Sequence, residues 1–302
     1  MKFFECVPNV SEGRDSAVID ACARAIEGAG VRLADRSSDP VHHRSVFTYF
    51  GDAEIVVAAS AALARVCLER IDLRIQRGAH PRIGALDVLP FVPFGDATLA
   101  DAAAVARMAA EAIWEATGIP SFLYGAAATS AERRELPALR RGGFEGLLAS
   151  GGPLGPPDVG TVAAHPSAGA CAVGARNVLV AFNVVLASDD LALAKRIARR
   201  IRERDGGLPG VRALGIALAQ GRVQVSCNLL DVGATPLDLV RDLVAREAAH
   251  AGVAVAGCEL IGLVPRAALA AVVARKLGCE AEALAPLAQP AESSSRTAAN
   301  PP

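Results

Sequence analysis

The sequence predicts an α+β protein with two ferredoxin-like (βαββαβ) subdomains that form a cleft. The order strand, helix, strand, strand, helix, strand occurs twice along the 302-residue chain. Both repeats close on a strand that ends in Val-Pro, at Val92-Pro93 and at Val264-Pro265. Apolar residues also recur at helical spacing in the second repeat, as Leu193, Ile197 and Ile201 do.

In the first repeat, a strand over residues 3–13 precedes a helix over 15–30, because Asp15 or Ser16 can cap the helix and apolar residues follow at helical spacing. Runs of β-branched and aromatic residues then predict further strands. The remaining elements are strands over 31–35 and 44–51, a helix from about 52 to 70 and a strand over 84–93.

The second repeat has the same order. It begins with a strand over 177–186 and a helix over 191–207, whose arginines occupy the polar side. Strands over 211–219 and 222–231 follow, and Thr235 and Pro236 open the next helix, because proline suits a first helical turn. A strand over 255–265 closes the repeat.

The segment between the repeats has a helix, a strand over 118–125 and a Gly- and Pro-rich run over 140–176, which is either a functional loop or a surface linker. We therefore expect an N-terminal subdomain over 1–176 with its core in 1–93, and a C-terminal subdomain over 177–280. The Ala-, Pro- and Ser-rich tail over 281–302 is expected to be disordered.

Composition excludes several classes of function. The formal net charge is −1, and no basic stripe indicates nucleic-acid binding. No signal peptide or membrane-length apolar run is evident, so we expect a cytoplasmic protein without membrane association. The seven cysteines include no CxxC pair and are expected to be core residues, and the five histidines form no metal-binding motif, so no metal is predicted.

Histidines in loops are the main candidates for chemistry. His80 lies in a Gly-Ala-His-Pro-Arg turn directly before an apolar strand, and His43 and His165 also lie in loops beside arginine, aspartate or proline. Such a histidine is either an acid–base group or an ordinary loop residue. Asn9 and Ser11, in the polar turn after the first strand, are either site residues or turn formers.

Five stretches together resemble the glutamate formiminotransferase family, over residues 3 to 275: ECVPNVSEGRD, GAHPRIGALDVLPFVP, PSFLYG, RRELPALRRGGFEGL and PSAGACAVGARNVLVAFNVVL. The resemblance implies two subdomains around a folate-binding cleft, and transfer of the formimino group of N-formimino-L-glutamate to N5 of tetrahydrofolate, in histidine degradation. It also implies that His80 is catalytic. The folate loop would comprise Gly160, Thr161, Val162, Ala163, Ala164, His165, Pro166, Ser167, Ala168 and Gly169. Family members commonly have an acidic residue where this chain has Ala79, and Asn where it has His43.

This reaction needs a proton to leave the attacking nitrogen and a proton to reach the departing one, and an imidazole with a pKa of about 6.5 can do both. Asp39 would orient the imidazole or stabilise the cationic amidine, unless it is only a turn residue before Pro40. Both substrates carry carboxylates, so we expect Arg44, Arg82 and Arg176 to bind them.

Two other functions are compatible with the sequence. A formyl-transferring or 5-formyltetrahydrofolate-metabolising relative would use a similar pocket. A folate-binding module without turnover is the other alternative, because one fold serves many functions. An exposed apolar face would also allow a homodimer.

Overall fold

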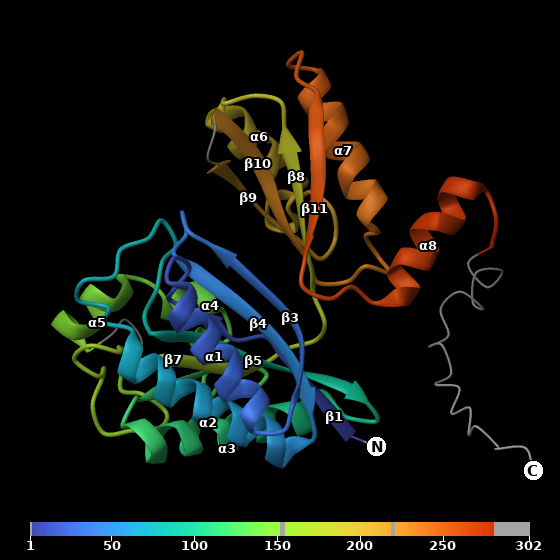
Figure 1. The fold of residues 1–302 in the computed structure, drawn as a ribbon. Helices are drawn as coiled ribbons and strands as arrows, with labels where there is room; N and C mark the ends of the chain where they lie inside the picture. The colour runs from blue at the N-terminus through green and yellow to red at the C-terminus, as the bar shows by residue number, and fades with distance from the viewer. Residues whose placement is uncertain (1, 152–154, 219–220, 281–302) are drawn as a thin grey trace, which may run out of the picture. The chain divides into compact units, whose positions relative to one another are not determined.

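The computed structural model describes residues 2–151, 155–218 and 221–280, so the predicted disordered tail lies outside the described residues. The chain is an α+β protein that divides into two compact units, Met1–Val178 and Leu179–Pro302 (Figure 1). Each unit has its own sheet and its own buried apolar core.

Unit 1 contains the predicted first repeat and an extension. The repeat comprises β1 (Lys2–Cys6), β2 (Asn9–Val10), α1 (Ser16–Gly28), β3 (Arg32–Asp39), β4 (Arg44–Gly51), α2 (Ala53–Arg70) and β5 (Leu86–Gly95). The extension comprises α3 (Leu99–Thr117), β6 (Ser121–Gly125), a 3-10 turn at Ala131–Arg133, α4 (Leu136–Leu139), α5 (Gly143–Ser150) and β7 (Cys171–Ala175).

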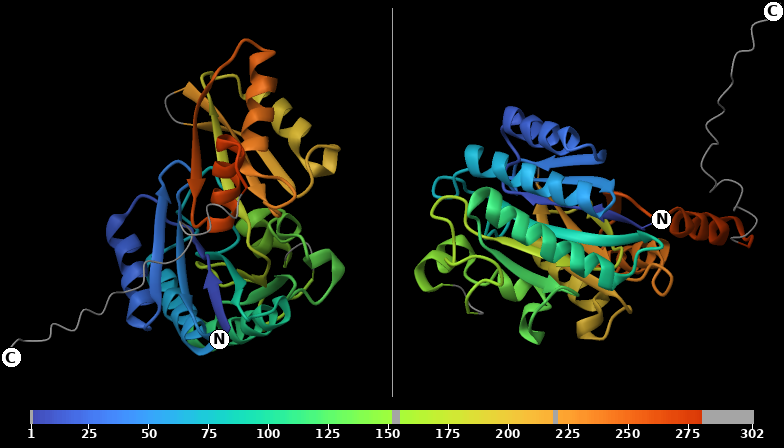
Figure 2. Two further views of the ribbon diagram at one scale, coloured as in Figure 1. Left: turned by 90° about the vertical axis from the view of Figure 1, so that its right-hand side faces the viewer. Right: turned by 90° about the horizontal axis from the view of Figure 1, so that it is seen from below.

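The sheet of unit 1 places the first strand in its middle. β4 and β5 pair antiparallel with β1 and β2 from opposite sides, β3 pairs with β4, and β7 then β6 continue beyond β5 as parallel strands. Helices α1, α2 and α3 lie side by side over one face of the sheet (Figures 1 and 2). They bury one apolar core against the strands, which includes Ile26, Leu63, Phe91 and Ile113.

Local sequence explains these elements. Asp15 caps α1, because its side chain accepts hydrogen bonds from the backbone N–H groups of Ala17 and Val18. The predicted strand over 3–13 is wrong in two respects: it is interrupted at Val7 and Pro8, and it ends at Val10. Proline has no N–H to donate to a ladder, although Pro8 O still accepts a hydrogen bond from Phe47 N at 3.1 Å.

Unit 2 has the order predicted for the second repeat: β8 (Val180–Leu186), α6 (Leu191–Ile201), β9 (Val211–Leu218), β10 (Arg222–Leu229), α7 (Leu237–Ala249) and β11 (Val255–Ile261). The antiparallel sheet has the strand order β11-β8-β10-β9. Leu193, Ile197 and Ile201 of α6 are buried in the core, as their spacing predicts. A further helix, α8 (Arg266–Leu277), follows the repeat and was not predicted.

Two predictions about local environment need correction. The run over 140–176 contains α5 and β7, and is therefore not loop throughout. β7 is a fully buried Cys-Ala-Val-Gly-Ala strand whose small residues have little strand propensity, but Gly174 fits because a Cβ there would lie 2.5 Å from the Tyr124 ring. Cys258 and Cys279 are exposed rather than core residues.

Residues 165–169 pack backbone to backbone against the segment that carries His80. Leu73 N donates to Ser167 O and Ala85 N donates to Ala168 O, both at 2.8 Å. Gly169 has φ +71°, and a Cβ there would lie 2.0 Å from Ile83 O. Only glycine fits this approach, which fixes the end of the predicted folate loop against Ile83, three residues after His80.

We expect Gly169→Ala to destabilise unit 1 more than Gly118→Ala does. Gly118 has a similar φ of +67°, but a Cβ there meets nothing within 4 Å, so that variant carries only the strain of about 1–2 kcal/mol. The steric clash at Gly169 should add roughly 1–3 kcal/mol. Urea unfolding of both variants measures the difference, and equal losses would contradict the close approach.

Candidate active site

A small hollow in unit 1 collects polar side chains from three segments. They come from the end of β2, from the β3–β4 turn and from the segment between α2 and β5: Ser11, His42, His43, Arg44, Gln76, His80 and Arg82. Of these residues, the sequence predicted Ser11, Arg44, His80 and Arg82 as site residues. His42 and Gln76 were not predicted.

Glycines allow the three segments to meet. A Cβ on Gly13 would lie 2.4 Å from Asp39 O and 2.5 Å from Arg44 N. A Cβ on Gly78 would lie 2.3 Å from His42 O. Because these backbones touch, the side chains that flank them are held close together.

His80 and Arg44 are directly paired. Arg44 Nη1 lies 2.5 Å from His80 Nε2, and since a guanidinium is donor only, Nε2 is the acceptor. Burial, Arg44 and Arg140 lower the pKa of His80 to about 3. Burial, with the Arg140 charge, also lowers the pKa of Arg44 to about 10, so Arg44 stays charged at neutral pH. The expectation that His80 titrates near neutrality is therefore wrong for the protein without substrate.

Asp39 orients the imidazole of His42 and not that of His80. Its Oδ2 lies 2.6 Å from Nδ1 of His42, while its Oδ1 accepts from the backbone N–H groups of Val41 at 2.8 Å and His42 at 2.9 Å. Although burial raises the pKa of Asp39, hydrogen bonds from His42 and Val41 outweigh that effect and lower it. Asp39 is thus both a turn residue and the partner of His42.

His43 shapes the turn. It is buried, its φ is +53°, and its Nδ1 accepts from Gly13 N at 3.2 Å. Burial lowers the pKa of His43, so its 3.3 Å contact with Glu12 is not a charged pair at neutral pH. Asparagine adopts this left-handed backbone more readily than histidine, which agrees with the Asn that the resemblance leads one to expect at this position.

Arg82 binds the protein itself. Its Nη2 donates to Leu73 O at 3.0 Å, to Gln76 O at 2.8 Å and to Glu145 Oε1 at 3.1 Å. Its guanidinium also lies over the ring of Phe144 at 5.9 Å. Arg82 therefore fastens α5 to the segment before His80, and Arg44 is the better candidate for binding a carboxylate.

Arg140 and Asp87 form a buried pair that sequence reasoning missed. Arg140 Nη2 donates to Asp87 Oδ2, and Asp87 Oδ1 accepts from Ile83 N at 2.8 Å. Asp87 is 1% exposed. Asp87 interrupts the apolar stretch after His80. A carboxylate that is buried there requires a cationic partner, so this aspartate was the sign in the sequence that such a pair exists.

The remaining predicted residues have varied positions. The loop over 160–169 turns at Gly160, and His165 Nδ1 accepts from Ala168 N at 3.2 Å, while Thr161, Val162 and Pro166 are exposed. Asn9 sits between β4 and β5 and donates to Val7 O at 3.1 Å. Arg176 donates to Asn177 O at 3.0 Å and interacts electrostatically with Tyr124 and Glu5 rather than with His80.

The low pKa of His80 predicts a stability profile. Between pH about 6.5 and about 3 the unfolded chain binds a proton at this position that the folded chain does not. The free energy of unfolding should therefore fall as the pH is lowered through this window, by up to about 1.4 kcal/mol per pH unit from this group. His80→Gln should weaken the decline, and urea unfolding at several pH values tests it. Parallel profiles of parent and variant would contradict the low pKa.

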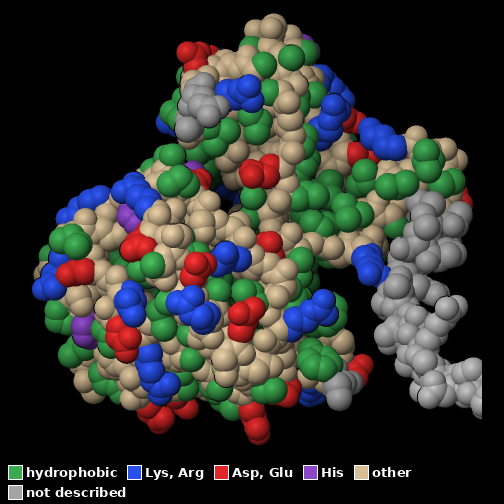
Figure 3. Space-filling model, in the orientation of Figure 1, with side chains coloured by type: hydrophobic (Ala, Val, Ile, Leu, Met, Phe, Trp, Pro, Cys, Tyr) green, Lys and Arg blue, Asp and Glu red, His purple; other side chains and the backbone are tan. Residues whose placement is uncertain are grey.

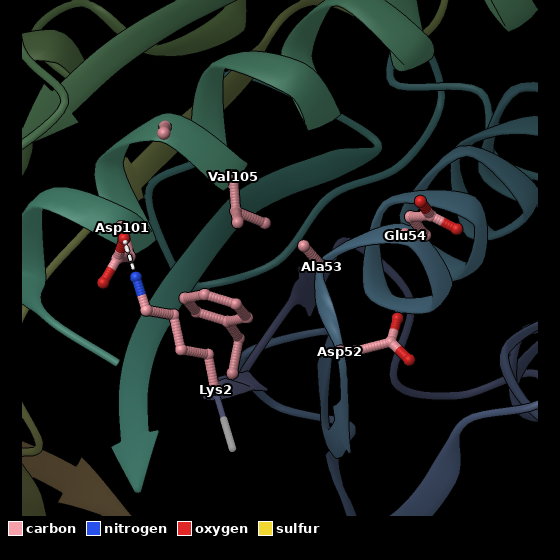
Figure 4. Close-up of a pocket in the computed structure, with 8 residues that line it drawn as sticks. Lys2, Asp52, Ala53, Glu54, Asp101 and Val105 are labelled. Carbon is pink, nitrogen blue, oxygen red and sulfur yellow. Dashed lines mark hydrogen bonds and ion pairs between the residues drawn. The ribbon is translucent and has the colours of Figure 1, made fainter. Parts of the chain in front are cut away.

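A second hollow, of about 510 Å³, lies on unit 1 beside the N-terminal ends of α2 and α3 (Figure 4). Three carboxylates line it: Asp52 caps α2, Glu54 lies in the first turn of α2, and Asp101 forms a capping box with Thr98 at the start of α3 and pairs with Lys2 at 2.8 Å. It therefore holds none of the acid–base groups found around His80.

The charge distribution, the candidate metal-binding groups and the helix lengths bear on other functions. Over the face drawn in Figure 3, acidic and basic side chains of unit 1 are interspersed. Among the described residues, no group of three or more His, Cys, Asp or Glu side chains is placed to hold a metal ion. Within the same residues, every helix is too short or too polar to cross a membrane.

The fold and the hollow define the class: a two-unit α+β protein whose first unit holds a buried histidine–arginine site suited to acid–base chemistry. The model of the formiminotransferase domain, N-terminal subdomain, matches residues 3–176, and that of the formiminotransferase domain matches residues 181–282. The chain belongs to the formiminotransferase family.

Known relatives agree with this membership. The chain is 43% identical to glutamate formimidoyltransferase of Streptococcus pyogenes serotype M1, over 89% of this chain and 91% of that protein. It is 39% identical to glutamate formimidoyltransferase of Thermoplasma acidophilum, over 89% and 90% respectively. It is 40% identical to formimidoyltransferase-cyclodeaminase of Sus scrofa, over 93% of this chain but only 53% of that protein.

Proposed function

We propose that this protein is a glutamate formimidoyltransferase, a one-carbon transferase of histidine degradation. It moves the formimino group of N-formimino-L-glutamate to N5 of tetrahydrofolate and releases L-glutamate. Tetrahydrofolate is the co-substrate, and no metal takes part. Family membership and the high coverage of relatives with that name support the reaction.

The observation that carries the assignment of the site is the pair of Arg44 and His80. Arg44 is charged, and its donor is held on His80 Nε2. A substrate carboxylate is a stronger acceptor for a guanidinium than a neutral imidazole is. When the carboxylate of formiminoglutamate binds Arg44, it neutralises that charge and releases Nε2, so the pKa of His80 rises on binding.

His80 then carries out the proton transfers. As N5 of tetrahydrofolate attacks the amidine carbon, its proton passes to His80, and a proton returns to the glutamate nitrogen as the carbon–nitrogen bond breaks. Ser11 and Gln76 also line the hollow, and within the described part of the chain Gln76 Oε1 has no hydrogen-bond partner. That buried acceptor suits an N–H group of a substrate.

We assign tetrahydrofolate to the loop over 160–169. Its support is the close packing of Ser167, Ala168 and Gly169 against the segment that carries His80. The loop thus has a defined position relative to the acid–base residue, as a wall of a two-substrate site requires.

The test is a spectroscopic assay of the purified protein with tetrahydrofolate and either N-formiminoglutamate or N-formylglutamate. Rapid turnover of the formimino donor alone is the expected result. Preference for the formyl donor would make the protein a formyl transferase, and folate binding without turnover of either donor would make it a binding module.

Several finer predictions belong with this proposal. Each unit is of the ferredoxin-like kind, which its βαββαβ order and the place of its first strand inside the sheet support. The subdomain boundary lies at 176/177, beside the change of compact unit after Val178. The cleft, the cytoplasmic location and the homodimer stay predictions.

A further inference from the structure

The two histidines of the hollow have opposite electrostatic surroundings. His80 has the guanidinium of Arg44 on its Nε2, and the charge of Arg140 also acts on it. His42 has the carboxylate of Asp39 at 2.6 Å from its Nδ1. The imidazole of His80 therefore faces positive charges, whereas that of His42 faces a carboxylate.

Asp39 also fixes the tautomer of His42. An ionised carboxylate only accepts hydrogen bonds, so Nδ1 of His42 carries the hydrogen and Nε2 keeps its lone pair. The other oxygen of Asp39 is held by the N–H groups of Val41 and His42, which locks the carboxylate in place. The arrangement has the form of a carboxylate–imidazole dyad, with one ring nitrogen ready to receive a proton.

His42 lies next to His80. The two ring centroids are 6.2 Å apart and the rings meet edge to face at 66°. Both side chains line the same hollow. Two imidazoles at this separation can exchange a proton through one solvent molecule that enters the hollow with the substrates.

We propose that the Asp39–His42 pair stores the proton that His80 takes from the substrate, a role that rests on the proposed function. The N5 proton passes to Nε2 of His80 as the new carbon–nitrogen bond forms. His80 passes a proton on to Nε2 of His42, which becomes an imidazolium paired with Asp39. When the bond to the glutamate nitrogen breaks, the proton returns through His80 to that nitrogen, so no net proton is gained or lost.

Two substitutions test the pair. His42→Ala removes the store, and kcat should fall by about 10–100-fold while KM for both substrates changes by less than about twofold. Asp39→Asn should have a similar effect. The carbonyl oxygen of the new asparagine would keep the hydrogen bonds from the N–H groups of Val41 and His42, so its amide nitrogen would face Nδ1 of His42. The hydrogen of the imidazole would then move to Nε2, which could no longer accept a proton.

Three further measurements separate proton storage from support of the turn. Added imidazole should restore part of the kcat of His42→Ala, which a purely structural residue would not permit. The double variant should lose no more than the larger single loss, because the two residues act as one unit. Val41→Ala is the matched control, since its exposed side chain shares the turn but not the pair, and it should keep parental kcat.

Each outcome either supports or overturns the role of the Asp39–His42 pair. Parental kcat in Asp39→Asn or His42→Ala, multiplicative losses in the double variant, or no rescue by imidazole would each overturn the proposal. The parent is assayed first with tetrahydrofolate and N-formiminoglutamate: no turnover by the parent contradicts the proposed function, whereas turnover with unaffected variants contradicts only the proton store.

Discussion

His80→Ala is expected to lower kcat by about 10²–10⁴, which is the usual contribution of a general acid–base group. Affinity for tetrahydrofolate should change little, because the loop over 160–169 makes its backbone hydrogen bonds to Leu73 and Ala85 rather than to His80. The loss should therefore appear in kcat and not in folate binding, measured by steady-state kinetics and by titration calorimetry.

His80→Gln is the informative companion variant. Its amide oxygen can still accept from Arg44, but the side chain neither takes up nor releases a proton at neutral pH. A catalytic His80 predicts equally low kcat in both variants, with melting temperatures close to that of the parent. If His80 only anchored Arg44, the glutamine variant would keep a near-normal rate, and that result would sink the acid–base assignment.

Arg44→Met should have two separate effects. Loss of the charge-assisted hydrogen bonds to the substrate carboxylate, each contributing about 1.5–3 kcal/mol, should raise KM for formiminoglutamate by at least about tenfold. The pKa of His80 should also rise, because burial would then act without the nearest positive charge. NMR titration of the imidazole measures the second effect.

Arg44→Lys is the matched control that separates the effect of the positive charge from the effect of the guanidinium geometry. Lysine keeps the positive charge but lacks the planar pair of donors, so it should hold the pKa of His80 low while recovering only part of the substrate affinity. An unchanged His80 pKa in Arg44→Met would show that burial and the Arg140 charge lower it without Arg44. Unchanged KM in that variant would remove Arg44 from substrate binding.

The sequence predicted what local patterns determine. The two repeats, the Asp15 cap and the buried stripe of α6 follow from spacing and capping, and the structure has them. The pairing of Asp39 with His42 was also within reach, because an aspartate that starts a turn binds the N–H groups two and three residues later.

Contacts between segments that are far apart in the sequence could not be predicted. Arg44 and His80 are 36 residues apart, and Asp87 and Arg140 are 53 apart, so no periodicity links them. The charge that keeps His80 neutral therefore depends on tertiary packing, which is why an ordinary imidazole pKa was expected. β7 was missed because its small residues are strand-forming only when they are buried between β5 and β6.

The parallel extension of the unit 1 sheet also determines the order in which this unit can fold. β7 pairs with both β5 and β6, so its docking must close long stretches of chain before any ladder hydrogen bond forms. The antiparallel pair β3–β4, joined by a short turn, has no such barrier. We therefore expect the β3–β4 turn to form early and the segment over 160–175 to dock onto β5 late. During synthesis, β5 would lack its parallel neighbour until the ribosome has released β7.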